Sequence, residues 1–223
     1  MPQVDTMTVC CAFCGALVKI VMSKNDVSAS FVNDSDLRSV AVDSETMGLM
    51  PHRDRLCLIQ LMKNSSDECH IVQFDNFNEA INLKNLFENE NVLKIFHYAR
   101  FDMTMIYRYL GVMIKNVYCT KIASKLARTY TGAHNLITLC RELLGVDLVK
   151  EQTCTDWGRD DITEAQKQYA AHDVLYLHRI MEALDVILAR EKRSALAKQC
   201  FDFLEARALF DLMIGDSYDI FAH

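Results

Sequence analysis

Three short apolar segments in the first third of the chain most limit what this sequence can fold into. SVAVD (39–43), LCLIQLM (56–62) and HIVQF (70–74) are rich in Val, Ile and Leu, which is typical of buried β-strands. Only short polar connections separate them, too short for a crossover helix, so antiparallel neighbours are expected. The sequence therefore predicts a sheet that begins with three antiparallel strands.

Helical and extended patterns alternate after the third strand. The expected strands are 93–97 and 117–120, and the expected helices are 79–91, 102–110, 120–130, 134–144, 163–190 and 194–213. Gly111 and Gly145 are expected to end two of these helices, and Thr163 with Gln166 forms a capping box at the start of another. Only 7 Gly and 2 Pro occur, which disfavours a barrel of many short strands. The predicted fold class is α/β, a mixed sheet with a helical C-terminal third.

Composition and charge exclude several classes of protein. Hydrophobic residues make up 51% of the chain and charged residues 24%, so a core can form and disorder of the whole chain is excluded. The net charge of −6 argues against coating of long nucleic acid, because that binding depends on Lys and Arg. The apolar run 8–18 is too short to span a bilayer. We therefore expect no membrane partner and a cytoplasmic location.

The beginning of the chain differs in composition from the rest. Residues 1–20 are expected to be a leader of flexible character, and 21–223 a single domain. The leader contains the segment CCAFC (10–14), but no pair of Cys or His follows it at zinc-finger spacing. The 9 cysteines are odd in number and scattered, which indicates reduced thiols in a cytosol rather than a disulfide framework.

Four acidic residues occupy positions that such a sheet would bring together. Asp43 and Glu45 are two residues apart at the end of a strand, so their side chains share one face. Asp102 follows the strand 93–97 and begins a helix, and Asp173 lies on a later helix. Because strand ends and helix starts converge at one edge of an open α/β sheet, we expect these four carboxylates to meet.

A cluster of this kind suits phosphoryl transfer. Carboxylate oxygens prefer hard ions such as Mg²⁺ or Mn²⁺, and two ions about 3.5–4 Å apart can activate water and stabilise a leaving oxygen. Tyr169, one helical turn before Asp173, would orient the attacking water and help to deprotonate it. Each pair of residues alone is common on solvated turns and helix surfaces, so the hypothesis depends on the ordered set.

Three segments resemble the exonuclease motifs of the DEDD superfamily, in the Tyr-x-x-x-Asp branch that includes ribonuclease D. They are AVDSET, HYARFD and YAAHDVLYL. Longer runs, among them ETMGLMPHRDRLCLIQL, CTKIASKLARTYT and DIFAH, resemble the alphaproteobacterial nano-RNase C family, which cleaves dinucleotides. The resemblance covers about 38–223. It implies a ribonuclease H-like fold, two metal ions on the four acids, 3′–5′ hydrolysis to mononucleotides and a homo-octameric ring.

Candidate substrate contacts lie beside these motifs. Leu49 would act as a wedge between two bases, and the resemblance implies that the backbone of Thr46 contacts the 3′-terminal sugar. His97 and Arg100 flank the second motif and are candidates for phosphate contacts. The alternatives are that Leu49 packs on its own domain and that His97 is a hydrogen-bonded core histidine.

The sequence thus predicts a metal-dependent 3′–5′ exoribonuclease for short RNA, above all dinucleotides such as pGpG. Few residues follow position 190, which together with the negative charge favours a short substrate over a long tracked strand. One alternative is a general 3′–5′ exonuclease that trims longer RNA or DNA ends. A second is a non-catalytic nucleic-acid-binding member of the fold, against which the complete acid set argues.

Overall fold

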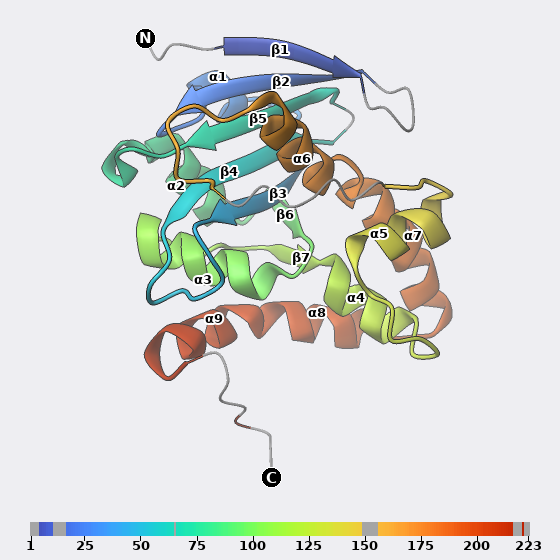
Figure 1. The fold of residues 1–223 in the computed structure, drawn as a ribbon. Coiled ribbons are helices and arrows are strands. Elements are labelled where there is room, and N and C mark those ends of the chain that lie inside the picture. Colours follow the sequence, from blue (N-terminus) through green and yellow to red (C-terminus); the bar gives the residue numbers. More distant parts are fainter. Residues whose placement is uncertain (1–4, 11–16, 65, 149–155, 216–219, 221–223) are drawn as a thin grey trace.

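The computed structural model describes residues 5–10, 17–64, 66–148, 156–215 and 220 of the chain. Their strands form one sheet in the order β1-β2-β5-β4-β3-β6-β7 (Figure 1). Residues 11–14 of the CCAFC segment and most of DIFAH lie outside the described residues.

The centre of the sheet has the predicted antiparallel arrangement. β3 (Ser39–Thr46) pairs with β4 (Leu56–Lys63), and β4 pairs with β5 (Glu68–Gln73), both antiparallel. β6 (Leu93–Phe96) and β7 (Val117–Cys119) then add in parallel at the side of β3. The predicted mixed sheet is confirmed.

Two further strands lie where the sequence analysis placed none. β1 (Asp5–Cys10) pairs antiparallel with β2 (Leu17–Lys24), and β2 pairs in parallel with β5. Residues 5–10 and 17–20 of the expected leader are therefore part of the sheet. β2 depends on pairing with residues about 49 positions away, as between Lys19 and Glu68, and no local pattern reports such a pairing.

Every predicted helix has a described counterpart, with different bounds, and the short helix α1 (Ala29–Val32) lies where none was predicted. The other described helices are the 3₁₀ helix η1 (Phe77–Glu79), α2 (Ile81–Glu88), α3 (Ala99–Leu110), α4 (Thr120–Ala127), α5 (Leu136–Leu144), α6 (Glu164–Leu175), α7 (Leu177–Arg190), α8 (Ser194–Asp202) and α9 (Leu204–Met213). Gly111 and Gly145 end α3 and α5 with φ of +74° and +66°, and the capping box of α6 is present. The helices expected over 163–190 and 194–213 are each divided, at Tyr176 and Phe203.

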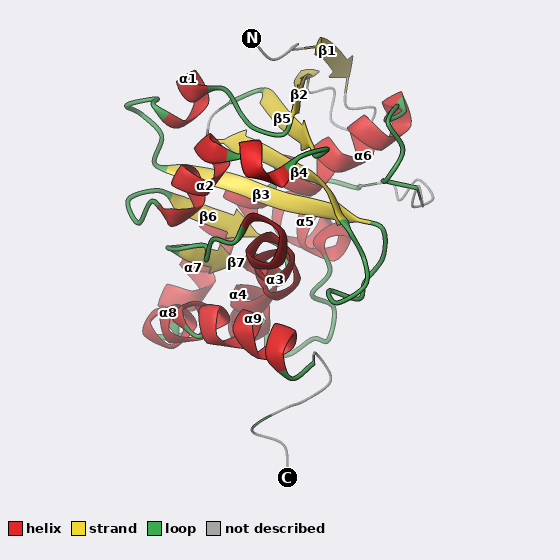
Figure 2. Cartoon of the chain, turned by 90° about the vertical axis from the view of Figure 1, so that its left-hand side faces the viewer, coloured by secondary structure: helices red, strands yellow, loops and turns green. Residues whose placement is uncertain are grey.

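The helices cover both faces of the sheet and create two apolar cores. Residues from α4 to α8 join one core with Ala41 and Leu58, while residues from α1, α2, α3 and α9 join the other with Val40 and Val42. Figure 2 shows α1 and α2 on one side of the sheet and α6 on the other. Because residues alternate along β3, Asp43 points with Ala41 toward the face that α6 covers.

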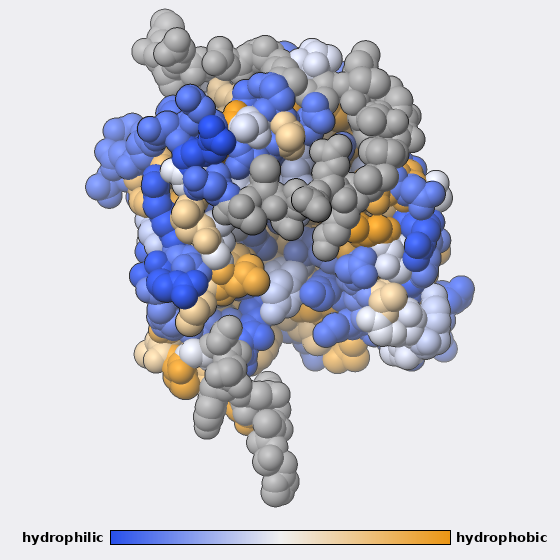
Figure 3. Space-filling model, viewed as in Figure 1, coloured by the Kyte–Doolittle hydropathy of each residue, from blue (hydrophilic) through white to orange (hydrophobic). Residues whose placement is uncertain are grey.

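The surface seen in Figure 3 is largely hydrophilic, and its hydrophobic side chains form separate small patches. Among the described residues, no helix combines the length and the apolar character that a bilayer crossing requires.

A buried ion pair joins α3 to α9. Asp211 is 3% exposed and accepts two hydrogen bonds from the Arg100 guanidinium, at 2.6 and 2.8 Å, while Arg207 lies 3.0 Å from the same carboxylate. We expect Asp211→Ala to lower the free energy of unfolding by about 3 kcal/mol, because both guanidinium groups lose their buried counter-charge. Urea denaturation measures this, with Asp202→Ala in the exposed pair with Lys198 as control, expected to cost less than about 1 kcal/mol. Equal losses in the two variants would contradict this account.

His178 makes the fold sensitive to acid. The imidazole is buried beside the Ser39 hydroxyl, 3.1 Å from Nε2, and burial lowers its pKa to about 4. The unfolded state therefore binds more protons between this pKa and the ordinary one, so stability is lost as pH falls through that range. From pH 7 to pH 5 the loss is about 2 kcal/mol. Urea denaturation at pH 7 and pH 5 measures the change in the free energy of unfolding. In His178→Gln this change should be about 2 kcal/mol smaller than in the wild type. An unchanged value would refute the role of His178.

Candidate active site

Three carboxylates from β3 and α6 meet at one point. α6 packs on β3, β4 and β5, as Figure 1 shows for the orange helix in front of the sheet. One carboxylate oxygen each of Asp43, Glu45 and Asp173 lies within 4.8 Å of the other two. The extended geometry of β3 puts the first two on one face, and Asp173 comes from the helix that covers that face. The structure thus brings together three of the four predicted acids as potential ligands.

Asp102, the fourth acid, lies beside this group in the first turn of α3. Its carboxylate is 4% exposed and accepts a hydrogen bond of 2.5 Å from the hydroxyl of Ser44, the residue between the two β3 acids. It is outside the group of three, yet its charge raises the pKa of both Asp43 and Glu45. The four acids therefore share one electrostatic environment.

Burial and mutual repulsion both disfavour the charged forms of these acids. Burial is the larger cause, and the neighbouring carboxylates add to it. The pKa of Asp43 is raised well above its ordinary value, that of Glu45 to about 9, and that of Asp102 to about 7. Clustered carboxylates that are largely shielded from water are stabilised by taking up protons or by a cation held among them. The donor set consists of hard oxygen atoms, so it fits a hard divalent cation.

Tyr169 lies one helical turn before Asp173 on α6. Its ring is 6.0 Å from that of the buried Trp157, centroid to centroid. Burial raises the pKa of the phenol, and the charges of Asp173, Glu45 and Asp43 raise it further. Its hydroxyl is therefore protonated at neutral pH and is a hydrogen-bond donor beside the acid group.

The loop between β3 and β4 lies next to the acids in sequence and is held by hydrogen bonds within it. The Asp54 carboxylate accepts a hydrogen bond of 2.9 Å from the Met50 amide, and a Cβ added at Gly48 would collide with that carboxylate. The Thr46 hydroxyl donates to the carbonyl of Gly48 within the same loop. At its tip, Leu49 is 79% exposed. The loop is thus fixed by its own polar contacts while it presents an apolar side chain to solvent.

His97 and Arg100 have protein partners in this structure. The Nδ1 atom of His97 lies 2.8 Å from the Thr120 hydroxyl oxygen, and burial, with the charge of Lys121, lowers its pKa to about 4. The imidazole is thus neutral, as in the alternative of a hydrogen-bonded core histidine. Arg100 is engaged with Asp211. Neither side chain belongs to the group of three carboxylates.

Sequence reasoning missed two polar residues beside the acids. Ser44 hydrogen-bonds Asp102, and Gln60 on β4 lies opposite Asp43 in the strand register. The sequence did contain a signal for each of them. Ser44 stands between the two acids of the first motif, and Gln60 is the single polar residue inside the apolar run LCLIQLM.

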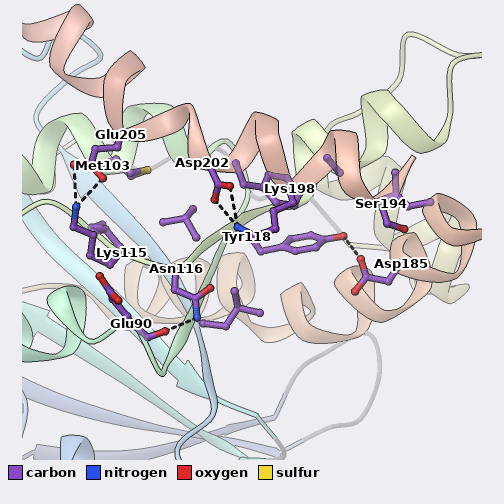
Figure 4. Close-up of a pocket in the computed structure, with 16 residues that line it drawn as sticks. Glu90, Met103, Lys115, Asn116, Tyr118, Asp185, Ser194, Lys198, Asp202 and Glu205 are labelled. Carbon is purple, nitrogen blue, oxygen red and sulfur yellow. Dashed lines mark hydrogen bonds and ion pairs between the residues drawn. The ribbon is translucent and has the colours of Figure 1, made fainter. Parts of the chain in front are cut away.

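A cavity of about 650 Å³ lies away from the acids, between β7, α7 and α8 (Figure 4). Several of its polar side chains are paired with one another. Lys115 contacts Glu205 at 2.8 Å, Lys198 contacts Asp202, and the Tyr118 hydroxyl donates to Asp185. No predicted site residue lines it.

Comparison with known proteins gives matches over most of the chain. A family model described as 3′-5′ exonuclease matches residues 18–189. Ribonuclease D of Jannaschia sp. (strain CCS1) is 33% identical over 158 residues, which are 70% of this chain and 41% of that protein. Ribonuclease D of Nitrobacter hamburgensis is 30% identical over 175 residues, 77% of this chain and 44% of that protein. The chain thus spans less than half the length of these curated relatives.

Solved structures extend the match to almost the whole length of another protein. NrnC of Brucella melitensis is 42% identical, with a TM-score of 0.86 over 92% of this chain and 98% of that chain. The same protein has been solved bound to pGG and with bound Mg²⁺. Ribonuclease D of Escherichia coli, 23% identical with a TM-score of 0.67 over 77% of this chain and 45% of that one, shares the fold. The resemblance to ribonuclease D and nano-RNase C is confirmed.

Because the acids repel one another, we predict that Asp43→Asn raises the thermal midpoint without metal and removes the stabilisation that metal gives. Asp43→Asn removes one of the repelling charges, so in EDTA we expect its thermal midpoint to lie roughly 3 °C above that of the wild type. The same variant should lose the rise in midpoint that Mg²⁺ causes in the wild type, because a ligand is gone. Calorimetry with Asp202→Asn as an exposed control measures both. A lower midpoint in EDTA together with a retained response to Mg²⁺ would refute the role of Asp43.

Proposed function

Because the chain belongs to the 3′-5′ exonuclease family, we propose that it hydrolyses short RNA from the 3′ end, with dinucleotides such as pGpG as preferred substrates. The observation that carries this proposal is the meeting of carboxylate oxygens of Asp43, Glu45 and Asp173 within 4.8 Å of one another. The short substrate is supported by the similarity to NrnC, which has been solved with pGG.

The acid group would hold two divalent cations, Mg²⁺ or Mn²⁺, with Asp43, Glu45, Asp102 and Asp173 as ligands. Support comes from the hard oxygen donors and from the electrostatic crowding that cations would relieve. When bound, two such ions lower the pKa of a water molecule and stabilise negative charge on the leaving oxygen. NrnC with bound Mg²⁺ fits this assignment.

The remaining groups of the site would position the reactants. The Tyr169 hydroxyl donates to the attacking water and orients it together with Glu45, while the Ser44 hydroxyl holds Asp102 in place. The backbone of Thr46, at the end of β3, would contact the 3′-terminal sugar. The water oxygen bonds to phosphorus, and the bond from phosphorus to the 3′ oxygen of the preceding nucleotide breaks. The products are a 5′-mononucleotide and a free 3′ hydroxyl.

Hydrolysis of a 5′-labelled diribonucleotide beside a heptaribonucleotide of the same sequence, with Mn²⁺ and then with EDTA, tests the function. We expect rapid cutting of the dimer, at least tenfold faster than that of the heptamer, and loss of all cutting in EDTA. Equal rates on the dimer and the heptamer would favour the second candidate, general 3′-5′ trimming of longer RNA or DNA. The similarity to ribonuclease D supports that candidate. If neither substrate is cut, the result would favour a non-catalytic nucleic-acid-binding protein.

Leu49 is the proposed wedge between the two bases. Its exposure in a fixed loop leaves the side chain free to stack against a base, which is worth roughly 1.4 kcal/mol, or tenfold in affinity. We expect Leu49→Ala to raise KM for the dinucleotide about tenfold with little change in kcat, because the contact does not touch the reacting atoms. Val186→Ala, a truncation at a similarly exposed position on α7, is the control. An unchanged KM would contradict the wedge.

The proposal also includes assembly into a homo-oligomer and a cytoplasmic location. A homo-octamer, which the resemblance implies, is measured by light scattering after gel filtration. A cytoplasmic location is supported by the free thiols of five cysteines whose side chains the structure describes, Cys57, Cys69, Cys119, Cys140 and Cys200.

A further inference from the structure

One buried side chain in the described part of the chain has no partner for any of its polar atoms. Gln60, in the middle of β4, is 0% exposed, and both its Nε2 and its Oε1 lack a hydrogen bond. Arg128 and Arg207 each have one such nitrogen, but other nitrogens of both are paired. An unpaired buried carboxamide destabilises a fold, so its retention at the centre of a sheet calls for a physical reason.

The strand register places this carboxamide beside the acids. Asp43 of β3 lies directly opposite Gln60, and Ile71 of β5 is opposite it on the other side. Residues opposite each other in antiparallel strands point to the same face, with Cβ atoms about 4.5–5.5 Å apart. Of the two cross-strand neighbours, only Asp43 offers a hydrogen-bond acceptor.

A second observation indicates that the charge of Asp43 affects side chains as far across the sheet as β5. Burial raises the pKa of the Cys69 thiol on β5, and the charge of Asp43 raises it further. Cys69 lies opposite Met62 of β4 and two residues from Ile71, so it shares a face with Gln60, which lies between Ile71 and Asp43 in the strand register. The amide is thus within the field of the acid group, under α6, which packs on all three strands.

We propose that Gln60 is a positioning residue for the metal ligand Asp43, and that its Nε2–H group donates a hydrogen bond to the Asp43 carboxylate when this carboxylate holds a cation. The inference rests on the metal site proposed above. The hydrogen bond would fix the carboxylate in one orientation and at the same time satisfy the buried donor.

The chemistry of the side chain explains why an amide stands here. A Lys or Arg opposite Asp43 would neutralise the carboxylate and compete with the cation. A neutral donor orients the carboxylate without adding positive charge, and its length lets it reach across the strand pair. Hydrogen-bond partners of metal ligands change metal affinity by about 10- to 100-fold.

Titration calorimetry of Mn²⁺ and Mg²⁺ on the full chain tests the proposal. Gln60→Met keeps the length of the side chain and removes the donor, so we expect 10- to 100-fold weaker metal binding. The thermal midpoint in EDTA should stay the same or rise, because an unpaired polar group has left the core. Ile71→Val, at the other cross-strand neighbour, is the matched control. It should lower the midpoint and leave metal affinity unchanged.

Three results would overturn the inference. Wild-type metal affinity in Gln60→Met, with a lower midpoint, would give Gln60 a purely structural role. If that variant does not fold, a crystal structure of the wild type with Mg²⁺ decides: Nε2 about 3 Å from an Asp43 oxygen supports the proposal, and a separation above about 4 Å refutes it. Failure of the wild type itself to bind either cation would refute the proposed metal site as well, which distinguishes that failure from one confined to Gln60.

Discussion

Repulsion among the partly buried carboxylates between β3 and α6 is the constraint on which the rest of this structure depends. Asp43, Glu45 and Asp173 are held close together, and both burial and the neighbouring acids oppose the charged forms of Asp43 and Glu45. The fold must therefore supply enough favourable packing elsewhere to hold them in place. It does so with apolar cores on both faces of the sheet, and the small buried residues Ala170 and Ala171 let α6 approach β3 closely.

The acid group draws on separate parts of the chain, so its geometry requires the whole domain. β3 carries two acids, α3 carries Asp102 and α6 carries Asp173. α3 is in turn held by α9 through the ion pair of Arg100, a residue of the second motif, with Asp211. A cation in the acid group would then offset the repulsion among the carboxylates. Metal binding would therefore stabilise the fold as well as prepare the site for hydrolysis.

Local sequence patterns predicted the elements that carry the site, because apolar alternation, the capping box at Thr163 and the glycine helix ends are short-range signals. They could not predict contacts that only the tertiary fold creates. Arg100 meets Asp211 across 111 residues, and the pairing of β2 with β5 has no local counterpart. The break at Tyr176 was also missed, since the apolar spacing continues through it.

The central claim is that water, activated at the acid group, attacks the 3′-terminal phosphodiester. Hydrolysis of the mixed dinucleotide pApG in water enriched in ¹⁸O, followed by mass spectrometry of both products, tests it most directly. The account predicts one ¹⁸O atom in the phosphate of the released pG and none in pA, with no product from Asp43→Asn. Label in a 3′ phosphate on the adenosine product, or turnover that persists without Asp43, would contradict the account.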